Sequence, residues 1–222
     1  EAIESRYQFS NSERTAMHID DKKNIWLKSH YELYKYNSNE QYKKLIKYAF
    51  KDRIGTFFQD SSHKIWLAME IGFTNSSDLI YFDPNENSVF KKYADLDFRI
   101  NYMKESKDGK IWLAGTKGLY VLDKAKNTIK SIKETASLDI RSILETGDDE
   151  IWIATYGNGF YLYKNGVLHS FPLDKNGYLA TTHFFMEDEK GFFKITTNKG
   201  VFQVKKDILL SYVKNHQQNI YY

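Results

Sequence analysis

The sequence predicts an all-β fold made of five repeated units. All four tryptophans of the 222-residue chain stand in one recurring phrase, Ile-Trp-Leu or Ile-Trp-Ile, at steps of 40, 46 and 40 residues. Short runs of alternating apolar residues surround each phrase, and turn-forming residues separate these runs, as in antiparallel hairpins. Four short strands that return about every forty residues are typical of a propeller blade. We therefore predict a β-propeller, or part of one, of about five four-stranded blades.

The strands of each unit follow from this alternation in chain order. The innermost strands are expected at 16–20, 54–60, 100–105 and 140–145. The second strands carry the aromatic phrase, at Trp26, Trp66, Trp112 and Trp152, with Phe193 in the tryptophan place of the fifth copy. Third strands are expected at 33–36, 79–82, 119–122, 160–163 and 201–204, and weaker fourth strands at 43–48, 88–93, 128–133 and 167–171. We expect the five aromatic residues to be core, because bulky rings fill the space between adjacent sheets.

The ends of the chain depart from the repeat. The units cover approximately 11–50, 51–95, 96–135, 136–175 and 176–222, within a single domain or a fragment of one. The fifth unit loses its pattern at 207–214, where we expect the one helix. The run 7–9 is similar to the outer strand of a preceding blade, and two alternatives remain open: it completes the sheet of the fifth unit, or it remains from an upstream blade. We expect the chain to be a piece of a longer protein, because it lacks an initiator Met and stops at Tyr221-Tyr222 in what resembles a strand.

Composition argues against several classes of function. The net charge is only +3 and the acidic and basic residues are interleaved, so no basic stripe predicts nucleic-acid binding. There is no cysteine, and the six histidines lack metal-ligand spacing, so neither a disulfide nor a metal site is expected. No Gly-rich phosphate loop or nucleophile elbow is present, and we expect no cofactor and no catalytic residue.

The segment 108–120 reads Asp-Gly-Lys-Ile-Trp-Leu-Ala-Gly-Thr-Lys-Gly-Leu-Tyr. It resembles the two-component regulator propeller repeat, whose core is Gly-x-Ile-Trp-Ile-Gly-Thr followed by Gly-Leu-Tyr. The fourth and fifth units keep parts of this pattern, whereas the first and second diverge after the tryptophan. The resemblance implies a periplasmic sensory module of a hybrid histidine kinase or a related one-component regulator. It also implies partners: an oligosaccharide breakdown product, further propeller blades and a downstream signalling domain.

Arginine is scarce and regularly placed. Four of the five arginines precede a motif tryptophan by 11 to 13 residues, at the starts of the predicted innermost strands: Arg14, Arg53, Arg99 and Arg141. In a propeller these starts surround one mouth of the central channel, and arginine suits carboxylate or sulfate recognition. One hypothesis is therefore an anion-attracting rim. The alternative is that each arginine pairs with a nearby acid.

The loops between second and third strands should reach the same mouth. They carry aromatic, acidic and amide side chains of the kinds that bind sugars: Tyr31, Glu70, Phe73, Tyr156 and Asn158. The expected function is ligand sensing without catalysis. Two alternatives remain open, a protein-interaction or homodimerisation scaffold and a propeller-type carbohydrate-active enzyme.

Overall fold

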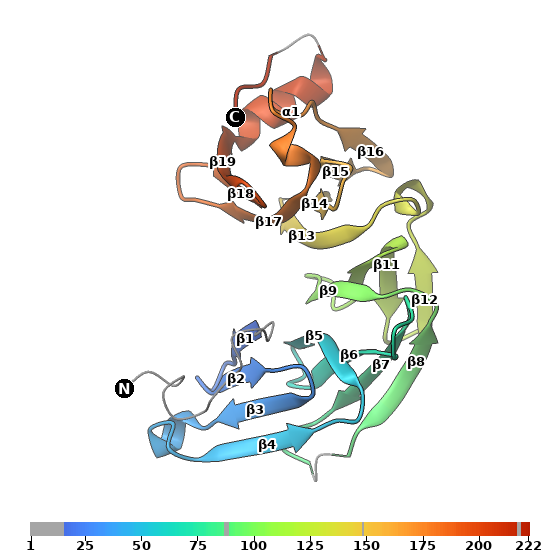
Figure 1. Ribbon diagram of the computed structural model, residues 1–222, viewed down its shortest axis with the longest axis vertical. Coiled ribbons are helices and arrows are strands. Elements are labelled where there is room, and N and C mark those ends of the chain that lie inside the picture. The colour runs from blue at the N-terminus through green and yellow to red at the C-terminus, as the bar shows by residue number, and fades with distance from the viewer. Residues whose placement is uncertain (1–15, 87–88, 148, 217–218) are drawn as a thin grey trace. The chain divides into compact units, whose positions relative to one another are not determined.

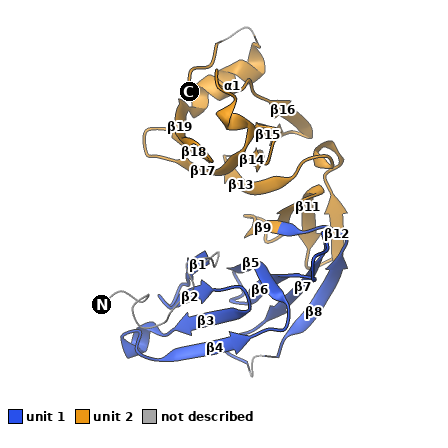
Figure 2. Ribbon diagram, viewed as in Figure 1, with its two compact units in different colours: residues 1–100 blue, residues 101–222 orange. Residues whose placement is uncertain are grey.

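The computed structural model describes residues 16–86, 89–147, 149–216 and 219–222, and its elements are almost all strands (Figure 1). The residue contacts divide the chain into two compact units, residues 1–100 and 101–222 (Figure 2). Among the described residues no helix is long and apolar enough to span a membrane.

Unit 1 contains two antiparallel four-stranded sheets, each formed by consecutive strands. The first sheet comprises β1 (Ala16–Ile19), β2 (Ile25–Lys28), β3 (Glu32–Tyr36) and β4 (Leu45–Ala49). The second comprises β5 (Arg53–Gln59), β6 (Ile65–Glu70), β7 (Ser77–Phe82) and β8 (Lys91–Leu96). These bounds follow the predicted strands closely, because the alternation that predicted them is the alternation of the two sheet faces.

Unit 2 contains two more four-stranded sheets, one of three strands, and a helix. The third sheet comprises β9 (Ile100–Glu105), β10 (Ile111–Gly115), β11 (Gly118–Asp123) and β12 (Thr128–Ser131). The fourth comprises β13 (Ile140–Thr146), β14 (Glu150–Thr155), β15 (Phe160–Lys164) and β16 (Val167–Ser170). The fifth comprises β17 (Thr182–Glu187), β18 (Phe192–Thr197) and β19 (Gly200–Lys205), and α1 (Lys206–Lys214) follows it.

The turn before each motif strand has one backbone feature that recurs in all five sheets. The residue two positions before the motif isoleucine, or before Phe193 in the fifth sheet, adopts a positive φ each time. These residues are Lys23, His63, Gly109, Asp149 and Gly191. In the second sheet the Asp60 carboxylate stabilises this turn by accepting the backbone N–H groups of Ser62 and Lys64 at 2.9 and 3.0 Å. Such Asx turns hold a tight hairpin without help from distant contacts, which explains why the local sequence predicted them.

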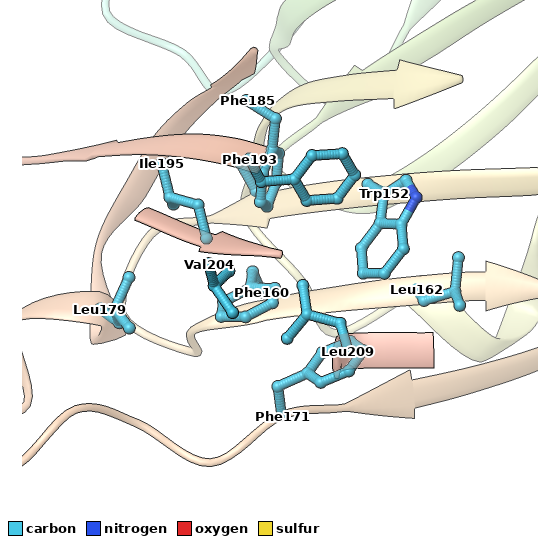
Figure 3. Close-up of a cluster of buried hydrophobic side chains, with 11 residues drawn as sticks. Trp152, Phe160, Leu162, Phe171, Leu179, Phe185, Phe193, Ile195, Val204 and Leu209 are labelled. Atoms are coloured by element: carbon cyan, nitrogen blue, oxygen red, sulfur yellow. The ribbon is translucent and has the colours of Figure 1, made fainter. Parts of the chain in front are cut away.

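Within each unit, the tryptophan-bearing face of one sheet packs on the following sheet. In unit 2, Trp152 is fully buried and meets the Phe193 ring edge-on, with ring centres 4.8 Å apart, as Figure 3 shows. In unit 1, Trp26 is also fully buried and contacts Phe82 of the second sheet. This repeated packing provides most of the core, since a four-stranded sheet cannot bury its own faces.

The fifth sheet differs from the predicted plan in two ways. Its fourth strand is replaced in the described residues by α1, as the lost alternation at 207–214 predicted. Leu209 of α1 is fully buried in one cluster with Phe171 from the end of the fourth sheet. The strand register also shows that Lys194, not Phe193, holds the tryptophan position. Phe193 pairs with Glu187 as Ile151 pairs with Glu145, so Phe193 takes the place of the isoleucine before the tryptophan.

Candidate functional site

Unit 2 brings four polar or aromatic side chains together at the start of β13. Arg141 Nη2 donates a hydrogen bond to Asp139 Oδ2 over 3.2 Å. The Arg141 guanidinium carbon lies 4.6 Å from the centre of the Tyr156 ring, within range of a cation–π contact. Asn101 Nδ2, on β9, donates to Asp139 Oδ1 at 2.9 Å. We call Asn101, Asp139, Arg141 and Tyr156 the Arg141 cluster.

A β-bulge aims the Arg141 side chain. Ile140 pairs with Thr155 and Ser142 pairs with Ala154, so Arg141 is the extra residue with no partner opposite it. A bulge re-aims the side chain that it carries. Tyr156 follows β14 directly, and its backbone N–H donates to the Asp139 carbonyl oxygen over 2.9 Å. Tyr156 is therefore anchored through its backbone, and the residue is still 51% exposed.

Unit 1 forms a comparable group at the start of β5. Arg53 Nη1 lies 3.5 Å from Glu70 Oε2, and Arg53 Nη2 lies 3.2 Å from His30 Nε2. The neighbouring Tyr31 ring is 52% exposed and meets His30 edge-on. Gly55 leaves room for this arrangement, because a Cβ there would come within 3.2 Å of the Glu70 side chain. We call His30, Tyr31, Arg53 and Glu70 the Arg53 cluster.

The two arginines occupy different places in their sheets despite their similar spacing from tryptophan. Ile54 pairs with Met69 and Ile140 pairs with Thr155, so these two isoleucines correspond. Arg53 directly precedes Ile54, whereas Arg141 directly follows Ile140. Both arginines pair with a nearby carboxylate, and both Nε atoms are buried without a hydrogen-bond partner in the described part of the chain.

The other predicted site residues are not gathered into these groups. Arg14 lies outside the described residues, and Arg99 immediately precedes β9. Phe73 is fully exposed in the loop between β6 and β7. Asn158 is exposed in the turn between β14 and β15. Neither Phe73 nor Asn158 belongs to the two clusters as the described coordinates define them.

Three cluster residues were missed by the sequence reasoning. Asp139 stands two residues before Arg141 and could have been suspected as its partner. Asn101 and His30 carry no such signal: Asn101 is 38 residues from Asp139, and His30 is 23 residues from Arg53. Contacts of this range depend on how neighbouring sheets pack, which no local pattern states.

Both clusters offer an exposed phenol ring beside charged and amide groups. Such a surface can stack on the C–H face of a ligand and exchange hydrogen bonds with hydroxyl groups. The adjacent carboxylates offset the arginine charge, so neither cluster is strongly cationic. Among residues 16–86, 89–147, 149–216 and 219–222, no group of three or more His, Cys, Asp or Glu side chains is arranged to hold a metal ion.

No protein-family model matches the chain, and no curated protein matches it. Solved structures do resemble it. The extracellular domain of a proposed hybrid two component system from B. thetaiotaomicron has a TM-score of 0.72 at 15% identity, over 96% of this chain and 30% of that one. PorZ, an essential surface component of the type-IX secretion system of Porphyromonas gingivalis, gives 0.68 at 14% identity, over 91% and 33%. Virginiamycin B lyase from Staphylococcus aureus gives 0.62 at 13% identity, over 85% and 68%.

The chain therefore spans about a third of the length of the first two of these proteins. One of them belongs to the class that the repeat motif indicated, and another is an enzyme, so the shared fold alone does not select a function. At these identities the likeness establishes the architecture: the chain is built of β-propeller blades.

Proposed function

We propose that the chain is an extracytoplasmic ligand-sensing segment of a two-component signal-transduction regulator that responds to carbohydrate breakdown products. The observation that carries the proposal is the regulator-type repeat at 108–120 on a fold shared with the extracellular domain of a proposed hybrid two component system. Its partners would be an oligosaccharide, further propeller blades of the parent protein and a downstream signalling domain. Ligand binding would favour one packing arrangement of the blades over another, and this shift would pass to the signalling domain.

The Arg141 cluster supports the carbohydrate part of the proposal. Its Tyr156 ring is half exposed, its Arg141 side chain is held in place by Asp139, and Asn101 adds an amide. A preorganised ring with fixed polar neighbours is what a sugar site requires, since little ordering is left for the ligand to cause.

Thermal-shift screening of the protein against neutral and acidic oligosaccharides tests the function. A ligand at 100 times its Kd adds about 2.7 kcal/mol to the stability of the folded state, which moves the unfolding midpoint by several degrees. Tyr156→Ala should reduce the shift, whereas Tyr221→Ala should not, because Tyr221 is an 80% exposed tyrosine outside the cluster. If no saccharide shifts the midpoint, the carbohydrate proposal is wrong.

A second candidate is a protein-interaction scaffold, and one surface favours it. Phe184, Met186 and Val201 are 45%, 57% and 65% exposed, and strand pairing through β18 places them on one face of the fifth sheet. Open apolar faces of this kind often bind another protein. The partner would be a second copy of the chain or another blade. Light scattering tests binding to a second copy of the chain. A dimer that Val201→Lys converts to a monomer supports the scaffold. A monomer without any substitution contradicts self-association.

A further inference from the structure

The fifth sheet repeats the β-bulge that aims Arg141 in the fourth sheet. Thr182 pairs with Thr197, and the next residue of β17 to pair is Phe184. His183, between them, is therefore the extra residue of β17, as Arg141 is the extra residue of β13. Because a bulge re-aims the side chain that it carries, the same backbone feature places one polar side chain on each of two successive sheets.

His183 makes the contact that corresponds to the one between Arg141 and Tyr156. Tyr156 is the first residue after β14, and Asn198 is the first residue after β18. His183 Nε2 lies 2.7 Å from Asn198 Oδ1, just as the Arg141 guanidinium lies against the Tyr156 ring. The fifth sheet thus has a second polar pair at the equivalent place. We call His183 and Asn198 the His183 pair.

Hydrogen bonds join the fourth and fifth sheets beside these two pairs. The Thr155 backbone N–H donates to Thr182 Oγ1 over 3.0 Å, and both residues are fully buried. Ser142 Oγ donates to the His183 carbonyl oxygen over 2.7 Å. Buried bonds of this kind hold the two strand ends in one arrangement. The two pairs are therefore positioned before a ligand arrives, which reduces the ordering cost of binding.

The two pairs are close enough for one ligand to contact both. Tyr156 and Thr181 form an antiparallel bridge, and His183 follows Thr181 by two residues. Bridged Cα atoms lie about 5 Å apart, and two strand residues extend about 7 Å, so the Cα atoms of Tyr156 and His183 are at most about 12 Å apart. The two pairs occupy equivalent positions, so they are offset by about one sheet spacing, roughly 10 Å. Two linked sugar rings span such an offset.

Each pair keeps hydrogen-bond donors that no described residue uses. Arg141 donates to Asp139 through Nη2, and its Nη1 group has no partner in the described part of the chain. Asn198 turns Oδ1 toward His183, and the residue is exposed. Its Nδ2 group has no partner among the described residues either. Such donors suit the hydroxyl and ring oxygens of a sugar, which accept hydrogen bonds.

The third sheet uses the corresponding side chain inside the protein. Asn101 directly follows Ile100, as Arg141 follows Ile140. Asn101 Nδ2 donates to Asp139 Oδ1 at 2.9 Å and to the Ile140 carbonyl oxygen at 2.8 Å, which occupies both of its hydrogens. We therefore expect a ligand of the Arg141 cluster to extend toward the fifth sheet, where the amide donors of the His183 pair are available.

We propose that the His183 pair is a second subsite beside the Arg141 cluster, and that the two together bind two linked rings of an oligosaccharide. One ring stacks on Tyr156, and Asn198 Nδ2 donates to an oxygen of the next ring. His183 is a positioning residue, because it acts by holding Asn198. This inference rests on the proposed function and deepens it: the ligand has at least two rings, and a free monosaccharide fills only one subsite.

¹H–¹⁵N NMR titration of the whole chain with matched sugars tests the length of the ligand. The probes are glucose against cellobiose and maltose, mannose against mannobiose, and galacturonic acid against digalacturonic acid. We expect at least one disaccharide to bind about tenfold more tightly than its own monosaccharide, because the second ring gains hydrogen bonds. That disaccharide should also move the Asn198 side-chain amide signal, which Asn198→Ala identifies by its loss. The monosaccharide should leave this signal in place.

Four variants locate the effect. Asn198→Ala should remove the advantage of the disaccharide, about tenfold, and leave the affinity for the monosaccharide unchanged. His183→Ala should act in the same direction, since it releases Asn198. Tyr156→Ala should weaken binding of both sugars, because both stack on its ring. Gln203→Ala, the matched control, removes an exposed amide from β19 of the same sheet and should change neither affinity.

The outcomes separate the second subsite from the broader function. Equal affinities for the monosaccharide and the disaccharide would overturn the subsite and leave carbohydrate sensing intact. The same holds if Asn198→Ala and His183→Ala both leave the affinity for the disaccharide unchanged. Binding that Tyr156→Ala does not weaken would overturn the Arg141 cluster as the site and the second subsite with it. If no probe binds, the subsite and the carbohydrate proposal both fail. Asn198 is exposed in the turn between β18 and β19, so its substitution should leave the unfolding midpoint unchanged.

Discussion

Replacing each of two tryptophans of unit 2 by phenylalanine should destabilise the protein by different amounts. Trp152 is fully buried, stacks on Phe171 with ring centres 5.6 Å apart, and donates its N–H to Thr146. Trp152→Phe removes that hydrogen bond, which contributes about 1 kcal/mol. It also leaves a cavity that costs about 1 to 2 kcal/mol in a packed core. The expected loss in the free energy of unfolding is therefore about 2 to 3 kcal/mol.

Trp112→Phe should cost less than about 1 kcal/mol, because the N–H has no hydrogen-bond partner in the described part of the chain and the ring already borders a cavity. Urea unfolding followed by far-UV circular dichroism measures both variants under one set of conditions. Both substitutions lie in unit 2 and occupy the same position in the repeat, so each is the control for the other. Equal losses of stability would refute the assignment of bonded and unbonded indoles.

Four further substitutions test two turns and two titratable groups. Gly118→Ala should lower the free energy of unfolding by about 3 kcal/mol, since φ is +95° and a Cβ would strike the backbone of the turn after β12. Gly109→Ala, where φ is +78° and the space is open, should lower it by only about 1 to 2 kcal/mol. Thermal or urea unfolding measures both variants. Burial of Asp20 raises its pKa, but hydrogen bonds, chiefly from Trp26, outweigh this and hold the pKa below 3.8. Its stabilisation is thus complete above about pH 4 and is lost as the pH falls through the folded-state pKa, so Asp20→Asn should flatten the acid limb of stability against pH. Burial lowers the pKa of His169 below 6.5, so the folded state binds fewer protons than the unfolded state near that pH. Stability should therefore fall as the pH drops below about 6.5. In His169→Gln, stability should depend less steeply on pH in this range.

Local patterns predicted most of the secondary structure. The strands and the tight turns were found because alternation and turn residues act within a few positions of one another. The helix was found in the same way, from the loss of alternation at 207–214. The fifth repeat was misaligned by one residue, because Phe193 looks like a replacement for tryptophan. Only the hydrogen-bonded register shows that Lys194 stands there and Phe193 fills the isoleucine place.

The candidate sites were predicted less completely. Spacing from tryptophan located Arg53 and Arg141, 13 and 11 residues before it, and it missed the β-bulge that both sheets share, in which Gly55 and Arg141 are the extra residues. A bulge adds a single residue and leaves the apolar alternation around it nearly intact, so the sequence does not reveal it. The other neighbours of these arginines, Glu70, His30 and Tyr156, come from distant parts of the sequence, and the pairing and packing of the strands decide that they meet.

The sequence by itself determined the repeat, the class of fold and the order of strands, because periodic apolar residues and turn residues determine these locally. The tertiary structure decided how the repeats differ. Four tryptophans look equivalent in the sequence, yet among the described residues Trp112 alone has a buried indole N–H without a partner, and its ring borders a cavity. That difference depends on where the side chain of a turn residue points and on how closely the next sheet packs, and both are settled only when the sheets assemble.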